Sequence, residues 1–287
     1  MIKNNLKIGF IGQGWIGKNY ADDFERRGFN VVRYSQEEPY IGNKEKIKNC
    51  DIVFIAVPTP TTSKGFNLGI VKKVIKLVGS GKIAVIKSTI IPGSTEKLQK
   101  ENPDIFVMHS PEFLTEATAA KDVASPHHNI IGIPINSAIY RAKAKMVLDI
   151  LPKSNSEKIC MAREAELFKY ARNCFFYSKV VFMNILYDLS QKIGADWKVL
   201  GDLIVVDPWI GPMHVNPVHK NGRGGGGHCF IKDFAALTRL YKKEMKKDKA
   251  GITVLSAIER KNIELLIKSK KDLDLLMGVY GKKIKLR

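Results

Sequence analysis

Residues 6–35 read LKIGFIGQGWIGKNYADDFERRGFNVVRYS, and this stretch decides the fold. It opens with an apolar run typical of a buried strand, turns through GQGWIG (12–17), continues with helical periodicity and ends in a second apolar run. A GxGxxG turn between a strand and a helix indicates a dinucleotide site, because its glycines let a pyrophosphate approach the helix N-terminus. We therefore expect the cofactor to contact Gly12, Gly14, Trp15, Ile16 and Gly17.

Ser35 stands at the end of the second predicted strand. An acid in this place normally receives the ribose 2′-hydroxyl of NAD. Arg33 lies two residues earlier, and an arginine in this region suits the 2′-phosphate of NADP. We expect NAD, with Ser35 among its contacts, and the residues leave NADP open.

Apolar runs alternate with helical patterns through the first half of the chain, which predicts an α/β fold with a doubly wound parallel sheet. In such sheets ligands bind beyond the carboxyl ends of the strands. Polar clusters follow three of the predicted strands: VPTPTT (57–62), KST (87–89) and SPEFLTE (110–116). From these clusters we expect the cofactor to contact Val57, Pro58, Thr59, Thr89 and Glu116.

The alternation ends near residue 160, and residues 162–194 then have the pattern of one long helix. A helix of about 32 residues would be about 48 Å long, which is more than a small domain needs. It should link domains or pack against a second subunit. We place a Rossmann-like NAD-binding domain at 1–158, and a long connecting helix with a helical, dimerisation-type domain at 159–287.

Cys229 follows a loop with almost no side chains, in the sequence GRGGGGHCFIKD (222–233). The glycines would let a ligand approach the main chain, and a thiol there can be a nucleophile if its surroundings favour the thiolate. The alternative is a flexible glycine loop with an ordinary buried cysteine. Lys169 and Asn173, four residues apart on one helix face, are donors that could stabilise an alkoxide. Spacing alone does not bring them to Cys229.

The composition indicates a soluble chain of 287 residues, 45% of them hydrophobic, which is enough for two cores. No apolar run approaches the ~18 residues of a membrane span, and the N-terminus enters a strand pattern at once, so we expect a cytoplasmic protein without membrane attachment. The four cysteines show no CxxC spacing and no cluster with the six histidines. We expect reduced thiols and no metal.

The formal charge is +19, and the lysines concentrate late in the chain. Such an excess favours anionic partners such as phosphorylated small molecules, although lysines that alternate with acids also form ordinary solvated surfaces. No aromatic residues interleave with the lysines as a single-strand binding platform would require, so we do not expect nucleic acid as a partner.

Seven motifs together carry a family resemblance over about residues 6–240. In order along the chain they are GxGxxG (12–17), FIAVPTP (54–60), KSTIIPGST (87–95), SPEFLTEATAAKD (110–122), AELFKYARN (165–173), GAD (194–196) and GGGGHCFIKD (224–233). This sequence resembles the UDP-glucose/GDP-mannose dehydrogenase family. The resemblance implies oxidation of the C6 alcohol of a nucleotide sugar to the carboxylate with two NAD molecules. From the long helix we expect a homodimer joined through residues 162–194.

The resemblance also implies residue roles. Cys229 would capture the aldehyde as a thiohemiacetal, which a second oxidation converts to a thioester. Lys169 and Asn173 would stabilise the oxyanions, Asp233 and Thr89 would order water or take a proton, and Glu112 would assist hydrolysis. The substrate side would be lined by Phe113, Leu114, Glu116, Lys169, Asn173, Gly226 and Lys232.

The sequence departs from the family pattern at four positions. Trp209 stands where the family usually has an arginine, Ile231 replaces a common proline and Ser35 replaces the cofactor acid. At His228, the residue before the cysteine, the sequence resembles those family members that act on N-acetylated hexosamine nucleotides. Family members also continue with a third, nucleotide-gripping domain that opens with a strand like GKKIKLR (281–287), so we expect a truncated form or a partner that supplies this grip. These departures leave the sugar undefined.

Three alternatives to UDP-glucose oxidation stay open. One is a UDP-N-acetylhexosamine dehydrogenase. Another is a two-electron 3-hydroxyacid or 6-phosphogluconate-type dehydrogenase, which shares GxGxxG and a Lys-x-x-x-Asn helix but needs no thiol. The third is a non-catalytic nucleotide-binding relic, which the joint presence of Lys169, Asn173, Cys229 and Asp233 disfavours.

Overall fold

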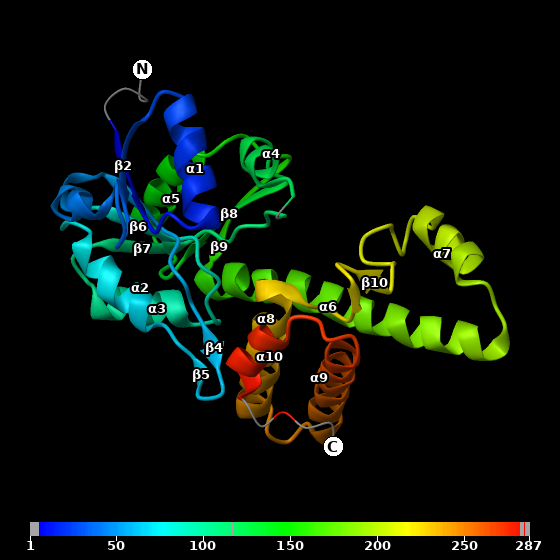
Figure 1. The fold of residues 1–287 in the computed structure, drawn as a ribbon. Helices are drawn as coiled ribbons and strands as arrows, with labels where there is room; N and C mark the ends of the chain where they lie inside the picture. The colour runs from blue at the N-terminus through cyan, green and yellow to red at the C-terminus, as the bar shows by residue number, and fades with distance from the viewer. Residues whose placement is uncertain (1–5, 116, 282–283, 285–287) are drawn as a thin grey trace. The chain divides into compact units, whose positions relative to one another are not determined.

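The computed structural model describes residues 6–115, 117–281 and 284, and the chain divides into two compact units. The first unit comprises Met1–Thr59 and Asn67–Lys169, and the second comprises Pro60–Phe66 and Tyr170–Arg287. Each is described by itself (Figure 1).

The first unit is built on a seven-stranded sheet with the order β2-β1-β3-β6-β7-β8-β9. The strands are β1 (Lys7–Ile11), β2 (Asn30–Tyr34), β3 (Ile52–Ile55), β6 (Ile83–Ile86), β7 (Phe106–His109), β8 (His128–Ile133) and β9 (Ser156–Met161). The chain places β2 on one side of β1 and β3 on the other, so the carboxyl ends of β1 and β3 border the crevice where such sheets bind ligands.

The predicted doubly wound α/β fold is confirmed, with one correction to the all-parallel sheet. β8 pairs antiparallel with β7 through His109 and Gly132, and β9 is parallel to β8. Strand direction depends on the path of the connection, which periodicity does not report. The helical segments of this unit are α1 (Trp15–Arg26), η1 (Ile41–Asn49), α2 (Gly69–Val74), η2 (Ile75–Leu77), α3 (Ser94–Glu101), α4 (Ala119–Ala124) and α5 (Ala138–Ile150).

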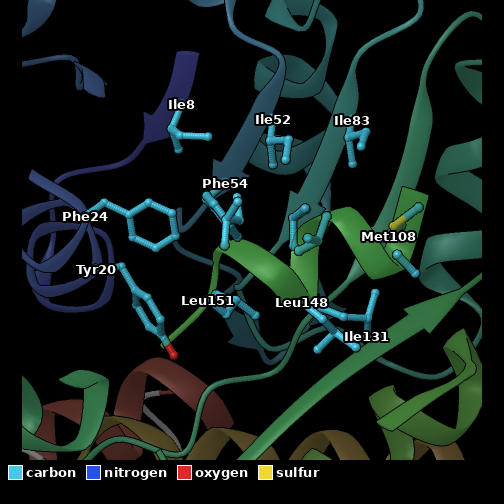
Figure 2. Close-up of a cluster of buried hydrophobic side chains, with 14 of the residues drawn as sticks. Ile8, Tyr20, Phe24, Ile52, Phe54, Ile83, Met108, Ile131, Leu148 and Leu151 are labelled. Atoms are coloured by element: carbon cyan, nitrogen blue, oxygen red, sulfur yellow. The ribbon is translucent and has the colours of Figure 1, made fainter. Parts of the chain in front are cut away.

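One face of the sheet carries a continuous apolar core (Figure 2). Alternate strand residues such as Ile8, Ile52 and Ile83 point to this face, where Phe24 of α1 and Leu148 of α5 cover them. Aromatic rings form its centre, with the Phe10 ring stacked on Phe54 at 5.0 Å. Because complete burial of one such side chain contributes about 1.5–3 kcal/mol, this core holds the strand ends in place.

The second unit is mainly helical. It contains most of α6 (Ala162–Ile193), with α7 (Trp197–Val206), α8 (Gly227–Glu244), α9 (Lys249–Lys268) and α10 (Leu273–Tyr280). The long helix predicted for 162–194 is therefore confirmed as α6. Short antiparallel pairs are formed by β4 (Thr61–Thr62) with β5 (Gly65–Phe66), and by β10 (Val218–His219) with β11 (Gly222–Arg223).

Packing in the second unit fixes α8 at its centre. Ile231 and Ala235 of α8 are buried against Leu266 of α9 and Leu276 of α10, and the Phe234 ring stacks on Tyr177 of α6 at 4.0 Å.

Within the described residues, no helix combines the length and apolar character needed to span a bilayer.

Candidate active site

In the glycine turn after β1, Gly14 has free space beside it at the N-terminus of α1. A Cβ on Gly12 would lie 2.3 Å from the Ala56 carbonyl oxygen, and a Cβ on Gly17 would lie 1.9 Å from that of Gly12. Both glycines are therefore required by close packing. Gly14, the N-cap of α1, has no atom within 4 Å of its ideal Cβ other than those of its immediate chain neighbours, which leaves room for a pyrophosphate at the helix N-terminus.

Arg33, near the end of β2, forms ion pairs with two acidic residues of α1. Its guanidinium lies 2.7 Å from Asp22 and 2.6 Å from Glu25, and the residue is 8% exposed. Burial opposes its charge, but hydrogen bonds to Glu25 and Asp22 outweigh burial and raise the pKa of Arg33. Ser35 donates to the Glu37 carbonyl oxygen at 2.9 Å. The guanidinium of Arg33 is thus already paired with two carboxylates, which favours NAD over NADP.

A cavity of about 480 Å³ adjoins the end of β2. Its lining is largely apolar and combines Tyr34 at the end of β2 and Gln36 after it with Ile41, Lys44, Lys73, Val74 and Leu77. A cavity of this size and lining suits a ring system of a nucleotide.

The loops after β3 and β6 are tied to each other. Ser88 accepts the Val57 N–H at 3.0 Å and donates to the Val57 carbonyl oxygen at 2.7 Å, while the Thr59 hydroxyl donates to the Thr89 carbonyl oxygen at 2.7 Å. Val57, Thr59 and Thr89, three of the predicted cofactor contacts, therefore lie together at the carboxyl edge of the sheet. Glu116, another of them, lies outside the described residues.

Glu112 and Lys169 form a buried ion pair in the first unit. The Lys169 ammonium lies 2.8 Å from Glu112 Oε1 and 2.6 Å from the Glu112 carbonyl oxygen, and both residues are 3% exposed. Burial raises the pKa of Glu112, but the charge and hydrogen bond of Lys169, the Leu114 N–H and the Lys87 charge together outweigh burial and lower it overall. The predicted residues Phe113 and Leu114 adjoin the pair, because Leu114 N–H donates to Glu112 and Lys169 lies 5.6 Å from the Phe113 ring centroid.

Two further buried titratable residues near this pair were missed by sequence reasoning. Lys87 is 2% exposed, donates to Ser110 Oγ at 3.1 Å and lies 4.2 Å from the Tyr20 ring centroid. Burial lowers the pKa of Lys87 to about 7. His109 is fully buried with neither ring nitrogen hydrogen-bonded to any described residue, and burial lowers its pKa to about 3. The KST motif drew attention to Lys87, but nothing in the pattern assigned it a role.

Glu166, also missed, reaches from α6 to the N-terminus of α3. Its carboxylate accepts the N–H groups of Gly93 and Thr95 at 2.6 and 2.8 Å and the Thr95 hydroxyl at 2.6 Å. The N-cap of α3 is Gly93, which has no side chain, so Glu166 caps this helix from a distant part of the chain. Burial raises the pKa of Glu166 to about 7, although the Thr95 hydrogen bonds act in the opposite direction.

The second unit brings together a second group of predicted residues. Asn173 Nδ2 donates to Asp233 Oδ2 at 2.7 Å, and Lys232 Nζ lies 2.5 Å from Asp233 Oδ1. Asp233 is 1% exposed, so a buried carboxylate is held between an amide and an ammonium. Lys169 and Asn173, assigned to different units, lie one turn apart on the single helix α6.

Cys229 lies in the first turn of α8, four residues before Asp233 on the same helix face. It is exposed, whereas Cys50 and Cys174 are buried, so the alternative of an ordinary buried cysteine is wrong. Gly226, predicted to contact substrate, is the N-cap of α8. Trp209, the departure from the family arginine, is 93% exposed and so contributes nothing to the core of its own unit.

Two family models match the chain. The NAD binding domain of the UDP-glucose/GDP-mannose dehydrogenase family matches residues 41–147, and the central domain of the same family matches 163–263. A UDP-glucose 6-dehydrogenase of Rickettsia bellii is 31% identical over 300 residues, which cover 90% of this chain and 67% of that protein. The chain spans between about half and two thirds of the length of the UDP-glucose 6-dehydrogenases of three Rickettsia species that it matches.

Solved structures share the fold at low identity. A UDP-glucose dehydrogenase from Pyrobaculum islandicum has a TM-score of 0.77 at 24% identity and covers 91% of this chain and 69% of that one. A 3-hydroxyisobutyrate dehydrogenase from Mycobacterium tuberculosis has a TM-score of 0.69 at 14% identity and covers 97% of this chain and 99% of that one.

Proposed function

The chain belongs to the UDP-glucose/GDP-mannose dehydrogenase family, and from this premise we propose that it oxidises the C6 alcohol of a nucleotide sugar to the carboxylate with NAD. The observation that carries the proposal is the placement of Cys229, an exposed thiol in the first turn of α8, one turn before the buried Asp233. Helix N-termini favour thiolates, which are the nucleophilic form of cysteine.

The turn from Gly12 to Gly17 would hold NAD, since Gly14 leaves room for the pyrophosphate. Ser35 and the loops at Val57, Pro58, Thr59 and Thr89 would contact the rest of the cofactor. Glu116 belongs to the same proposal as a residue shared by cofactor and substrate. When bound, NAD supplies the hydride acceptor.

Cys229 retains the aldehyde formed by the first oxidation. Its thiolate adds to C6, a carbon–sulfur bond forms, and the carbonyl oxygen takes a proton to become the hydroxyl of a thiohemiacetal. Oxidation of this adduct leaves a thioester. Water then attacks the thioester carbon, the carbon–sulfur bond breaks, and the carboxylate leaves as the thiolate is restored, while the two protons of the water pass to solvent. Covalent capture makes the second oxidation follow before the aldehyde escapes.

The polar pairs supply proton and charge control for these steps. Asp233, held by Asn173, takes the proton released from the hydroxyl, and the Asn173 amide and Lys169 ammonium stabilise the oxyanion. Glu112, kept ionised by Lys169, orients the hydrolytic water together with Thr89. On the substrate side, Phe113 and Leu114 contact the sugar, and Gly226 and Lys232 contact the remainder.

The test is the count of NADH per acid formed with UDP-glucose, GDP-mannose and UDP-N-acetylhexosamines, which also identifies the sugar. We expect two NADH per acid. Cys229→Ser should abolish acid formation and spare the first oxidation, while Cys160→Ser, which changes a half-buried thiol in β9, should retain both. Acid formation by the Cys229→Ser protein would contradict the nucleophile assignment.

A two-electron 3-hydroxyacid dehydrogenase is the second candidate. It is favoured by the match to nearly the full length of the M. tuberculosis 3-hydroxyisobutyrate dehydrogenase. A single oxidation requires no thiol, so this candidate predicts one NADH per product and no effect of Cys229→Ser on turnover.

We infer that the partner is a second copy of this chain. Phe175, Phe182 and Leu189 of α6 recur every seven residues and are 64%, 55% and 51% exposed. A seven-residue apolar repeat is the pattern by which helices pair side by side. A neighbouring face of α6 is already occupied, because Met183 packs against Ile204 of α7.

A further inference from the structure

The glycine loop 222–227 packs closely against side chains from α9 and from the turn 269–272. A Cβ on Gly226 would lie 1.9 Å from Asp272 Oδ2, and one on Gly222 would lie 2.7 Å from Lys271 Cβ. A Cβ on Gly224 would lie 3.0 Å from Asn262 Oδ1. These glycines are therefore required by packing within the protein, a role different from the ligand approach expected from the sequence.

Hydrogen bonds attach the same loop at three successive residues, Arg223, Gly224 and Gly225. Asn262, 1% exposed, accepts the Gly225 N–H at 2.6 Å and donates to the Gly225 carbonyl oxygen at 3.0 Å. Ser269 accepts the Arg223 N–H at 3.0 Å, and Lys271 donates to the Gly224 carbonyl oxygen at 2.9 Å. The loop backbone is thus held by a bracket made of Asn262, Ser269, Lys271 and Asp272.

Asp272 completes the bracket at the start of α8. Its Oδ2 accepts the Gly227 N–H at 2.7 Å, the first N–H of the helix that carries Cys229 two residues later. The first N–H groups of a helix have no partner within the helix, and a local Ser, Thr, Asp or Asn usually accepts one. The N-cap here is Gly226, so this acceptor comes from 45 residues further along the chain.

We propose that Asp272 and Asn262 are positioning residues that hold the first turn of α8 and thereby set the place of the Cys229 thiol. The inference rests on the proposed function of Cys229 as nucleophile. The glycine loop has no side chains with which to hold itself, and glycine loses more conformational freedom on ordering than other residues. Without the bracket, the turn that presents the thiol would fray.

Hydrogen exchange and kinetics test this together. In Asp272→Ala we expect exchange of the amides at 225–229 to rise about five- to tenfold, the effect of losing a helix N-cap. kcat should fall while KM changes less than twofold. Asp272→Asn, which keeps an acceptor oxygen, should restore both. Asp274→Ala, which removes an exposed acid of the first turn of α10, should match the unchanged protein.

A second variant keeps the test decisive if Asp272→Ala folds poorly. Gly226 has φ −100°, which any residue adopts, so Gly226→Ala acts only through the collision with its neighbours, Asp272 Oδ2 first among them. It should reproduce the faster exchange and lower kcat. The double variant Gly226→Ala with Asp272→Ala should show the same exchange rates and kcat as Gly226→Ala alone, because both changes disrupt the same hydrogen bond, from the Gly227 N–H to Asp272 Oδ2. Additive losses would overturn the inference.

The outcomes separate this inference from the proposed function. Faster exchange with unchanged kcat in Asp272→Ala, or a kcat loss in Asp272→Asn as large as in Asp272→Ala, would overturn the positioning role and leave the nucleophile in place. Acid formation by Cys229→Ser would remove the nucleophile whatever the exchange rates.

Discussion

The Lys169 ammonium contacts Glu112 twice, at the carboxylate at 2.8 Å and at the main-chain carbonyl oxygen at 2.6 Å. The Lys169 side chain of α6 thereby holds both the main chain and the side chain of Glu112, in the loop after β7. With both partners only 3% exposed, both charges are almost entirely removed from solvent.

Lys169→Met should therefore destabilise the protein strongly. Removal of one partner from a buried ion pair leaves an uncompensated charge and costs about 3–5 kcal/mol. Denaturant unfolding measures this, and turnover should fall by more than about 100-fold, the effect of losing an oxyanion donor. Lys145→Met, which removes an exposed partner of Asp149, should leave the free energy of unfolding nearly unchanged. An equal fall in the free energy of unfolding in the two variants would show that the buried ion pair stabilises the protein no more than the exposed one.

Lys87 should give the protein a rise in stability with pH. Burial lowers its folded pKa to about 7, whereas the unfolded lysine keeps its proton to about 10.5. Between these values the unfolded state binds more protons, so the free energy of unfolding rises with pH, by on the order of 1–3 kcal/mol. Urea unfolding of the unchanged protein and Lys87→Met at pH 7 and pH 9.5 measures the difference. Parallel pH dependence in the two proteins would contradict the assignment.

Glu166 should make the free energy of unfolding fall as pH rises, in a window at lower pH than that of Lys87. Burial raises its folded pKa to about 7 from an ordinary value near 4.5, so the folded state binds more protons between these values. Stability should fall as pH rises through this window, by on the order of 1–3 kcal/mol, and this fall should be absent in Glu166→Gln. Thermal unfolding at pH 5 and pH 7.5 compares them. A fall of the same size in Glu166→Gln would assign it to other groups.

NAD should be preferred because Arg33 is already paired. Freeing its guanidinium with Asp22→Asn and Glu25→Gln together should improve kcat/KM for NADP by about tenfold relative to NAD, since one new charge contact of roughly 1.4 kcal/mol corresponds to that factor. Steady-state kinetics with both cofactors measure the ratio. Lys18→Ala, which removes only the exposed partner of Asp22, is the control. A preference for NADP in the unchanged protein would contradict the choice of NAD.

The sequence predicts those parts of the fold and site whose partners are local. The strand, the glycine turn and α1 follow one another within 30 residues, and α6 runs without interruption from Ala162 to Ile193, so both were identified. Glu166 and Lys87 could not be, because a charge within a helix or at a strand end reads as solvated until the facing element is known. The role of the glycine loop was missed for the same reason, since Asn262 and Asp272 follow it by 37 and 45 residues.

The exposed repeat on α6 predicts the assembly. In light scattering we expect a particle of twice the 32.2 kDa of one chain. Phe182→Glu places a charge at the centre of the repeat, where pairing would bury it without a partner, so the dimer should dissociate at micromolar concentration. Val254→Glu, which changes an exposed apolar residue of α9, should stay dimeric. Circular dichroism of Phe182→Glu should be unchanged, because the side chain is already 55% exposed in one chain. A Phe182→Glu protein that remains dimeric would place the interface elsewhere, and a monomeric unchanged protein would remove the second copy as partner.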